Sequence, residues 1–176
     1  ILCGAVGFFL LEFNNPETMG DMNLLEKMTA SLFQSVTTRT AGFATVPQGD
    51  LRESSKLLGC MLMFIGGSPA GTAGGVKTTT IAMLLLTVLC VLKNKRDTEC
   101  FARKIYNNIV RSGITITMIT LIFLMSGITA LTIFEPGIDF LDLTYEAASA
   151  MGTVGLTADL TPILSRGSHV DRKSVV

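Results

Sequence analysis

The chain has 176 residues, of which 48% are apolar and 16% are charged, and its 14 basic residues balance its 14 acidic residues. This apolar excess favours an integral membrane protein over a soluble globular protein. Zero net charge argues against a nucleic-acid partner, because proteins that bind nucleic acid need basic residues to neutralise phosphates. The sequence also lacks a nucleophile–base pair, a carboxylate pair and a metal-binding cluster, so we expect neither an enzyme nor a cofactor.

The start of the chain predicts the end of a membrane span and then a short helix. Residues 1–13 are an apolar run that leads to the turn signal Asn14-Asn15-Pro16. After an acidic loop, residues 24–36 form a second, mostly apolar run. This run is too short to cross a bilayer, which takes roughly 20 residues, so it predicts a re-entrant pore helix.

Residues 37–43 follow this short helix and contain a Thr-x-Gly sequence that predicts an ion filter. Thr-Val-Gly is the core of the potassium-channel filter, in which backbone carbonyl oxygens replace the hydration shell of the ion. Glycine reaches backbone angles that other residues avoid, so successive carbonyls can turn toward one axis. The candidate potassium-binding residues of this first filter copy are Thr38, Thr40, Ala41, Gly42 and Phe43.

Residues 57–92 form an apolar stretch that is too long for one span. An unbroken helix of this length would reach roughly 50 Å, against a hydrocarbon core of about 30 Å. Glycine and proline interrupt it, and non-helical backbone at membrane depth is tolerated where it is buried or lines a cavity. We therefore expect two half-helices around an intramembrane gate loop, whose candidate residues are Gly66, Gly67, Ser68, Pro69, Gly71, Gly74, Gly75 and Lys77.

Two other interpretations of this glycine-rich loop are less favoured. A helix-packing motif of small residues would explain Gly71 and Gly75, but not Pro69 or the excess length of the stretch. A phosphate-binding loop requires Gly directly before Lys, whereas here Val76 separates Gly75 from Lys77. The segments that flank the loop are also apolar helices, which is the wrong context for that motif.

The second half of the chain repeats the pattern of the first. Residues 93–111 are rich in Lys and Arg, which by the positive-inside rule predicts a cytoplasmic loop. Residues 112–134 are long enough to span the bilayer, and residues 140–150 predict a second pore helix. The second filter copy follows at 152–157, with the candidate residues Gly152, Thr153, Val154, Gly155 and Leu156. With the basic loop inside, both filter copies face the outside.

These elements predict an all-α integral membrane fold of repeated span–pore helix–span units, as in a potassium channel, with a broken helix after the first filter. Residues 1–92 would form one unit with a truncated first span, and residues 112–164 a second unit without its closing span. Thr40 and Thr153 stand 113 residues apart at equivalent places. We expect the chain to be a fragment and residues 165–176, which have no helical or strand pattern, to be a non-native tail.

At three motifs the chain resembles the Trk/Ktr/HKT superfamily of potassium transporters. The motifs are residues 37–43, the glycine-rich residues 66–78 and residues 149–157, and the resemblance extends to about residue 164. It implies subunits with four span–pore helix–span repeats around one pore, of which this chain matches the third and the fourth. It also implies that residues 66–78 are the gate, that subunits form homodimers, and that a cytoplasmic nucleotide-binding regulatory subunit contacts residues 93–111.

The leading functional hypothesis is potassium uptake, passive or coupled to another cation, by a multi-pass protein of the cell inner membrane in contact with lipid. Potassium is then the transported ion and not a cofactor. A sodium-permeable or sodium/potassium-coupled relative stays open as an alternative. The filter position that decides between potassium and sodium in this family lies in the first repeat. A non-conducting membrane receptor or structural subunit is the alternative from another class. With half a filter, the chain should not conduct alone.

Overall fold

The computed structural model describes residues 1–20, 22–69, 74–93, 99–100 and 103–158. Within these residues the chain forms six helices and one pair of two-residue strands. The fold is therefore almost entirely helical, as the sequence predicted. In chain order the elements are α1 (Leu2–Glu12), α2 (Leu24–Thr37), α3 (Glu53–Phe64), α4 (Thr78–Leu92), β1 (Glu99–Cys100), β2 (Arg103–Lys104), α5 (Asn107–Phe134) and α6 (Phe140–Met151).

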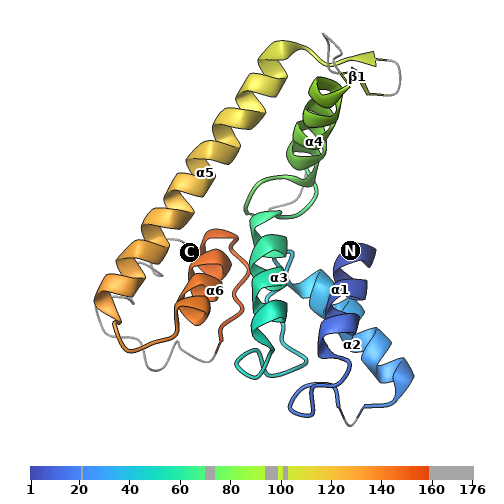
Figure 1. The fold of residues 1–176 in the computed structure, drawn as a ribbon, viewed down its shortest axis with the longest axis vertical. Helices are drawn as coiled ribbons and strands as arrows, with labels where there is room; N and C mark the ends of the chain where they lie inside the picture. Colours follow the sequence, from blue (N-terminus) through green and yellow to red (C-terminus); the bar gives the residue numbers. More distant parts are fainter. Residues whose placement is uncertain (21, 70–73, 94–98, 101–102, 159–176) are drawn as a thin grey trace.

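Helix α5 is the longest element and runs beside α4 (Figure 1). Its 28 residues make it, within the described part of the chain, the one helix long and apolar enough to cross a membrane. Helices α1 and α4 are apolar but shorter. No residue of α4 is buried, and few residues of α5 are. Large exposed apolar surfaces of this kind suit contact with lipid or with further protein.

The long apolar stretch is broken between α3 and α4, which follow one another along the long axis of the molecule (Figure 1). The Val76 amide donates a hydrogen bond to the carbonyl oxygen of Phe64, the last residue of α3, at 3.0 Å. Ile65 also pairs with Val76 in a parallel bridge. The chain thus returns close to the point where it left α3. Of the predicted gate residues, Gly71 lies outside the described residues.

The two short helices α2 and α6 pack against the helices that precede them, α1 and α5 respectively. Helix α6 also packs against α3, where a Cβ on Gly59 would lie 3.0 Å from the Tyr145 ring. A core of apolar side chains forms at this contact and lies directly behind the second filter copy. Its members are Cys60, Met63, Tyr145, Ala148, Val154, Leu156 and Ala158.

A buried carboxylate connects the end of α1 to the start of α3. Glu12 is fully buried, and its side chain accepts hydrogen bonds from the Asn15 amide and the Thr18 hydroxyl, each at 2.6 Å. It also accepts a hydrogen bond from the backbone N–H of Arg52 at 3.0 Å. Burying a carboxylate is costly unless donors surround it. These bonds therefore hold the loop after α1 against Arg52, the N-cap residue of α3.

Two helix boundaries and the content of one loop differ from the sequence-based prediction. Helix α3 begins at Glu53 rather than at residue 57, because an acidic first turn suits the positive end of the helix dipole. Helix α5 begins at Asn107 rather than at residue 112, so residues 107–111 of the expected loop are helical. The same loop contains β1 and β2, two short strands that pair antiparallel in an otherwise all-helical fold. Residues 94–98 and 101–102 of that loop lie outside the described residues.

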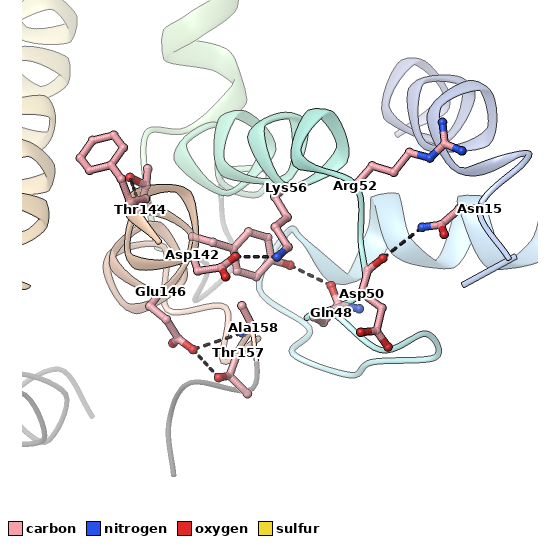
Figure 2. Close-up of polar contacts among 12 residues, drawn as sticks. Asn15, Gln48, Asp50, Arg52, Lys56, Asp142, Thr144, Glu146, Thr157 and Ala158 are labelled. Carbon is pink, nitrogen blue, oxygen red and sulfur yellow. Dashed lines mark hydrogen bonds and ion pairs between the residues drawn. The ribbon is translucent and has the colours of Figure 1, made fainter. Parts of the chain in front are cut away.

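An ion pair joins α3 to α6 across a large separation in sequence. The Lys56 Nζ lies 2.6 Å from the Asp142 Oδ1, and both side chains are mostly shielded from solvent (Figure 2). A charge held in such a place depends on its partner, because neither side chain is free to regain full hydration. The pair should therefore contribute to the docking of α6 on α3.

We expect Asp142→Asn to lower stability, because Lys56 then loses its counter-charge at a cost of about 1 kcal/mol for a partly exposed pair. The measurement is the melting temperature of the purified full-length protein. Asp139→Asn is the matched control, because Asp139 is exposed and makes no side-chain cap hydrogen bond. Equal melting temperatures for these two variants would contradict the assigned role of the pair.

Candidate functional site

The two predicted filter copies share an unusual backbone conformation. Thr40 and Gly42 have φ angles of +75° and +76°, and Thr153 and Gly155 have φ angles of +52° and +85°. Within the described residues, these two threonines are the only non-glycine residues with positive φ. A β-branched residue in the left-handed region is strained and needs neighbours that hold it there. The repeat seen in the sequence is therefore also a repeat of backbone geometry.

The two copies lie against each other. A Cβ built on Gly42 would lie 2.4 Å from the Val154 carbonyl oxygen, and one on Gly155 would lie 3.9 Å from the Gly42 Cα. Segments more than a hundred residues apart in sequence thus meet at their central residues. Glycine is required at position 42 for two reasons, its positive φ and this close approach of the backbone.

The central carbonyl groups of both copies are not used in hydrogen bonds within the described part of the chain. This holds for the carbonyl oxygens of Thr40, Ala41, Gly42, Thr153, Val154 and Gly155. Carbonyl oxygens without a protein donor can coordinate a cation that has lost its hydration shell. The residues that the sequence predicted as the centre of the filter are therefore brought together with suitable oxygen atoms.

The outer residues of the predicted filter have other roles. The Phe43 carbonyl accepts a hydrogen bond from the Thr37 hydroxyl at 2.6 Å, and the Leu156 carbonyl accepts one from the Ser149 hydroxyl. Thr38 caps the C-terminus of α2 and is buried, and its hydroxyl donates to the Ser35 carbonyl at 3.1 Å. These contacts attach each copy to the short helix before it. Gly152, the remaining candidate of the second copy, caps the C-terminus of α6.

The surroundings of the two copies differ. Leu156 is 2% exposed and packs in the core behind the second copy, whereas Phe43, its counterpart in the first copy, is 71% exposed. Val154 is buried in the same core, while Thr153 and Gly155 face the open side. The second copy is therefore supported from behind by protein in this chain. The first copy lacks such a cover among the described residues.

Both short helices end at a filter copy, α2 at Thr37 and α6 at Met151. The C-terminal end of a helix carries a partial negative charge. Two such ends close to the filter copies favour a cation nearby. This arrangement agrees with the electrostatics that a cation pathway needs.

Sequence reasoning missed a carboxylate that supports the second copy. Glu146 on α6 is buried, and its Oε1 accepts hydrogen bonds from the Thr157 hydroxyl and from the Ala158 backbone N–H, the latter at 3.1 Å (Figure 2). These donors directly follow the filter residues. The signal for it was present, because an acidic residue in the middle of a short helix that is expected to be buried needs a local partner.

The glycine-rich loop reaches the base of the second copy. The Gly74 amide donates to the Thr153 Oγ1 at 3.2 Å, and a Cβ on Gly74 would lie 2.7 Å from that oxygen and 2.8 Å from the Gly152 carbonyl oxygen. Gly66 is packed as closely, because its Cβ would lie 1.9 Å from the Gly74 carbonyl oxygen. The small residues of the loop thus allow direct contact between backbone segments.

The remaining predicted gate residues lie on either side of this contact. Gly67 is buried and its carbonyl oxygen accepts a hydrogen bond from the Thr78 amide at 3.3 Å, while Ser68 and Pro69 are exposed. Gly75 has a φ of +70°. Lys77 is the N-cap residue of α4 and is partly exposed. The lysine therefore stands at the start of a half-helix, beyond the contact with the filter.

We expect Gly42→Ala to destabilise the protein, because a side chain at this position combines backbone strain of about 1–2 kcal/mol with a clash against Val154. The melting temperature of the purified full-length protein measures the effect. Gly137→Ala is the control, because a Cβ there meets nothing within 4 Å. A Gly42→Ala protein as stable as the Gly137→Ala protein would show that the two copies do not lie as described.

Comparison with known proteins identifies the family. Residues 4–168 match the TrkH family, described as cation transport proteins. The chain is 42% identical over 157 residues to Ktr system potassium uptake protein B of Bacillus subtilis. The matched residues make up 89% of this chain and 35% of that protein. It is 35% identical over 170 residues to potassium/sodium uptake protein NtpJ of Enterococcus hirae. The matched residues make up 94% of this chain and 37% of that protein.

The chain spans about a third of the length of these relatives. The descriptions are of transport proteins, which agrees with the prediction that the chain is not an enzyme. The family match covers all three motifs on which the sequence resemblance rested. The chain therefore belongs to the TrkH family of cation transport proteins.

Proposed function

We propose that this chain is part of a potassium uptake protein and that residues 37–43 and 152–157 are two segments of one carbonyl-lined ion filter. The observation that carries the proposal is the matched left-handed conformation of Thr40 and Thr153 in segments that touch. A dehydrated cation needs several oxygen ligands at once, so adjacent segments with unbonded carbonyls suit it. Relatives described as potassium uptake and potassium/sodium uptake proteins support the choice of ion.

In this proposal α2 and α6 are pore helices that enter the membrane from outside, and the chain supplies the third and fourth of four repeats. The loop that contains β1 and β2 lies at the end of the molecule opposite the loops before α2 and α6 (Figure 1). That separation agrees with a cytoplasmic position for residues 93–111 and with filters that face outside. The cell inner membrane is then the site of action, with lipid against the exposed faces of α4 and α5.

The proposed partners are those that the family resemblance implies. Potassium is the transported ion, and the complete protein forms a homodimer that binds a cytoplasmic nucleotide-binding regulatory subunit near residues 93–111. The description of one relative as part of a Ktr system supports a multi-component assembly. A second candidate function is uptake of sodium together with potassium, favoured by the description of NtpJ.

The first test is rubidium or potassium uptake by the complete gene product in cells that lack their own potassium uptake. We expect uptake by the wild type and a loss of roughly tenfold or more with Gly155→Ser, because a side chain at positive φ is strained by about 1–2 kcal/mol and the filter has little tolerance. Gly137→Ala should transport normally. Measuring sodium uptake in the same cells separates the two candidate functions, since only a sodium-permeable protein carries sodium.

Absence of uptake by the wild type at normal membrane abundance would contradict the transport proposal. Uptake that is indifferent to Gly155→Ser would contradict the filter assignment. In that case a non-conducting receptor or structural subunit becomes the better interpretation.

We further propose that residues 66–77 form an intramembrane gate. The contact of Gly74 with Thr153 and Gly152 supports it, because a loop that touches the base of one filter segment lies where it can obstruct the path of the ion. Non-helical backbone between two half-helices is also the usual form of transport sites at membrane depth. In this proposal Thr153 is part of the filter and also contacts the gate loop.

Gly74→Ala tests the gate. The added Cβ cannot fit between the loop and Thr153, so the loop must move away. We expect the maximal rate of uptake to rise by roughly two- to fivefold with little change in KM, because gating steps set many turnover rates. An unchanged maximal rate at equal abundance would contradict the gate, and a raised KM would indicate a distorted filter instead.

A further inference from the structure

We infer that Gln34, Gln48 and Tyr145 form a buried hydrogen-bonded bridge that sets the position of one filter segment relative to the other. The inference rests on the proposed filter function and assigns positioning residues to it. Gln34 is on α2, before the first filter copy, and Gln48 is in the loop after that copy. Tyr145 is on α6, before the second copy.

The three side chains are connected through one amide group. Gln48 Oε1 accepts hydrogen bonds from Gln34 Nε2 at 2.6 Å and from Tyr145 Oη at 2.8 Å. Gln48 Nε2 donates to the Val46 carbonyl oxygen at 2.8 Å and to Gln34 Oε1 at 3.2 Å. Every hydrogen-bonding position of the Gln48 amide is therefore used.

The orientation of the Gln48 amide follows from its neighbours. The Val46 carbonyl can only accept, so it requires the Nε2 side of the amide, and this leaves Oε1 to face the Tyr145 hydroxyl. Gln34, Gln48 and Tyr145 are 0%, 3% and 0% exposed. Water therefore cannot replace a lost partner, and a polar group left unpaired there would be costly.

Each end of the bridge is attached to a filter copy. The Tyr145 ring belongs to the core that contains Val154 and Leu156 of the second copy. Gln34 lies in the last turn of α2, and its backbone carbonyl oxygen accepts a hydrogen bond from the amide of Thr38, a residue of the first copy, at 3.2 Å. A shift of either copy toward or away from the other would stretch the bridge.

The bridge is specific to this junction and is not repeated within each unit. At the repeat spacing of 113 residues, the counterpart of Tyr145 is Leu32 and the counterpart of Gln34 is Ala147, neither of which has a polar side chain. A hydrogen-bonded contact that served only to pack the short helices would be expected in both units. A set of side chains that fixes the distance between two particular filter segments needs to occur only once.

The test is Tyr145→Phe in the full-length protein, which removes the hydroxyl and keeps the ring in the core. Tyr106→Phe is the matched control, because the Tyr106 side chain is 75% exposed. Rubidium uptake is measured in cells without their own potassium uptake, together with its inhibition by sodium and the abundance of each variant in the membrane. We expect Tyr145→Phe to raise the KM for rubidium by roughly three- to tenfold, the effect of one lost buried hydrogen bond.

We also expect sodium to compete better in Tyr145→Phe, since a filter with altered spacing discriminates less between ions. A merely structural role predicts less protein in the membrane with unchanged KM and unchanged sodium competition. That result, or an equal effect of Tyr106→Phe, would overturn the inference. If the wild type carries no rubidium, the proposed function itself fails, which is a different outcome.

A double-mutant cycle with Gln48→Met adds a second measurement. Methionine removes the acceptor of the Tyr145 hydroxyl at similar volume, so Tyr145→Phe should have little further effect on KM in that background. Independent, additive effects would overturn the bridge. The KM of Tyr145→Phe alone decides the proposal if Gln48→Met does not accumulate in the membrane.

Discussion

The arrangement of this chain depends on two threonines held in the left-handed region of backbone conformation. Thr40 and Thr153 adopt a geometry that L-residues avoid, and each does so directly after a short helix. The strain persists because the flanking residues are tied down: a hydroxyl of each short helix, from Thr37 or Ser149, holds the carbonyl of the residue after the filter glycine. Within the described residues, the carbonyls between these ties accept no hydrogen bond.

Helix packing supplies the rest of the support, and it does so unequally. The second copy lies against a core to which α3, α5 and α6 contribute side chains. The Glu146 carboxylate also accepts a hydrogen bond from the Ala158 amide, just after this copy. The first copy has α2 and the loop that contains Gln48. The connection between the two copies therefore passes through buried polar groups and the ion pair of Lys56 with Asp142 as well as through apolar packing.

Much of this could be predicted from local sequence. The short helices follow from apolar runs too short for a span, and the break after Phe64 follows from clustered glycine and proline, because both effects are local. The start of α5 at Asn107 was not predicted, since a polar first turn carries no apolar signal. The contact of Gln48 with Tyr145 was also beyond prediction, because its partners lie 97 residues apart and meet only through tertiary packing.

The hydrogen bond between Gly74 and Thr153 has a consequence for the energetics of transport. It makes the loop and the backbone of the proposed filter parts of one thermodynamic system, in which neither can change its preferred state independently of the other. If an ion in the filter stabilises one position of Thr153, it also biases the loop, and a ligand that moves the loop changes ion affinity by the same factor. In the proposed filter, Thr153 is the residue through which the bound ion and the loop affect each other.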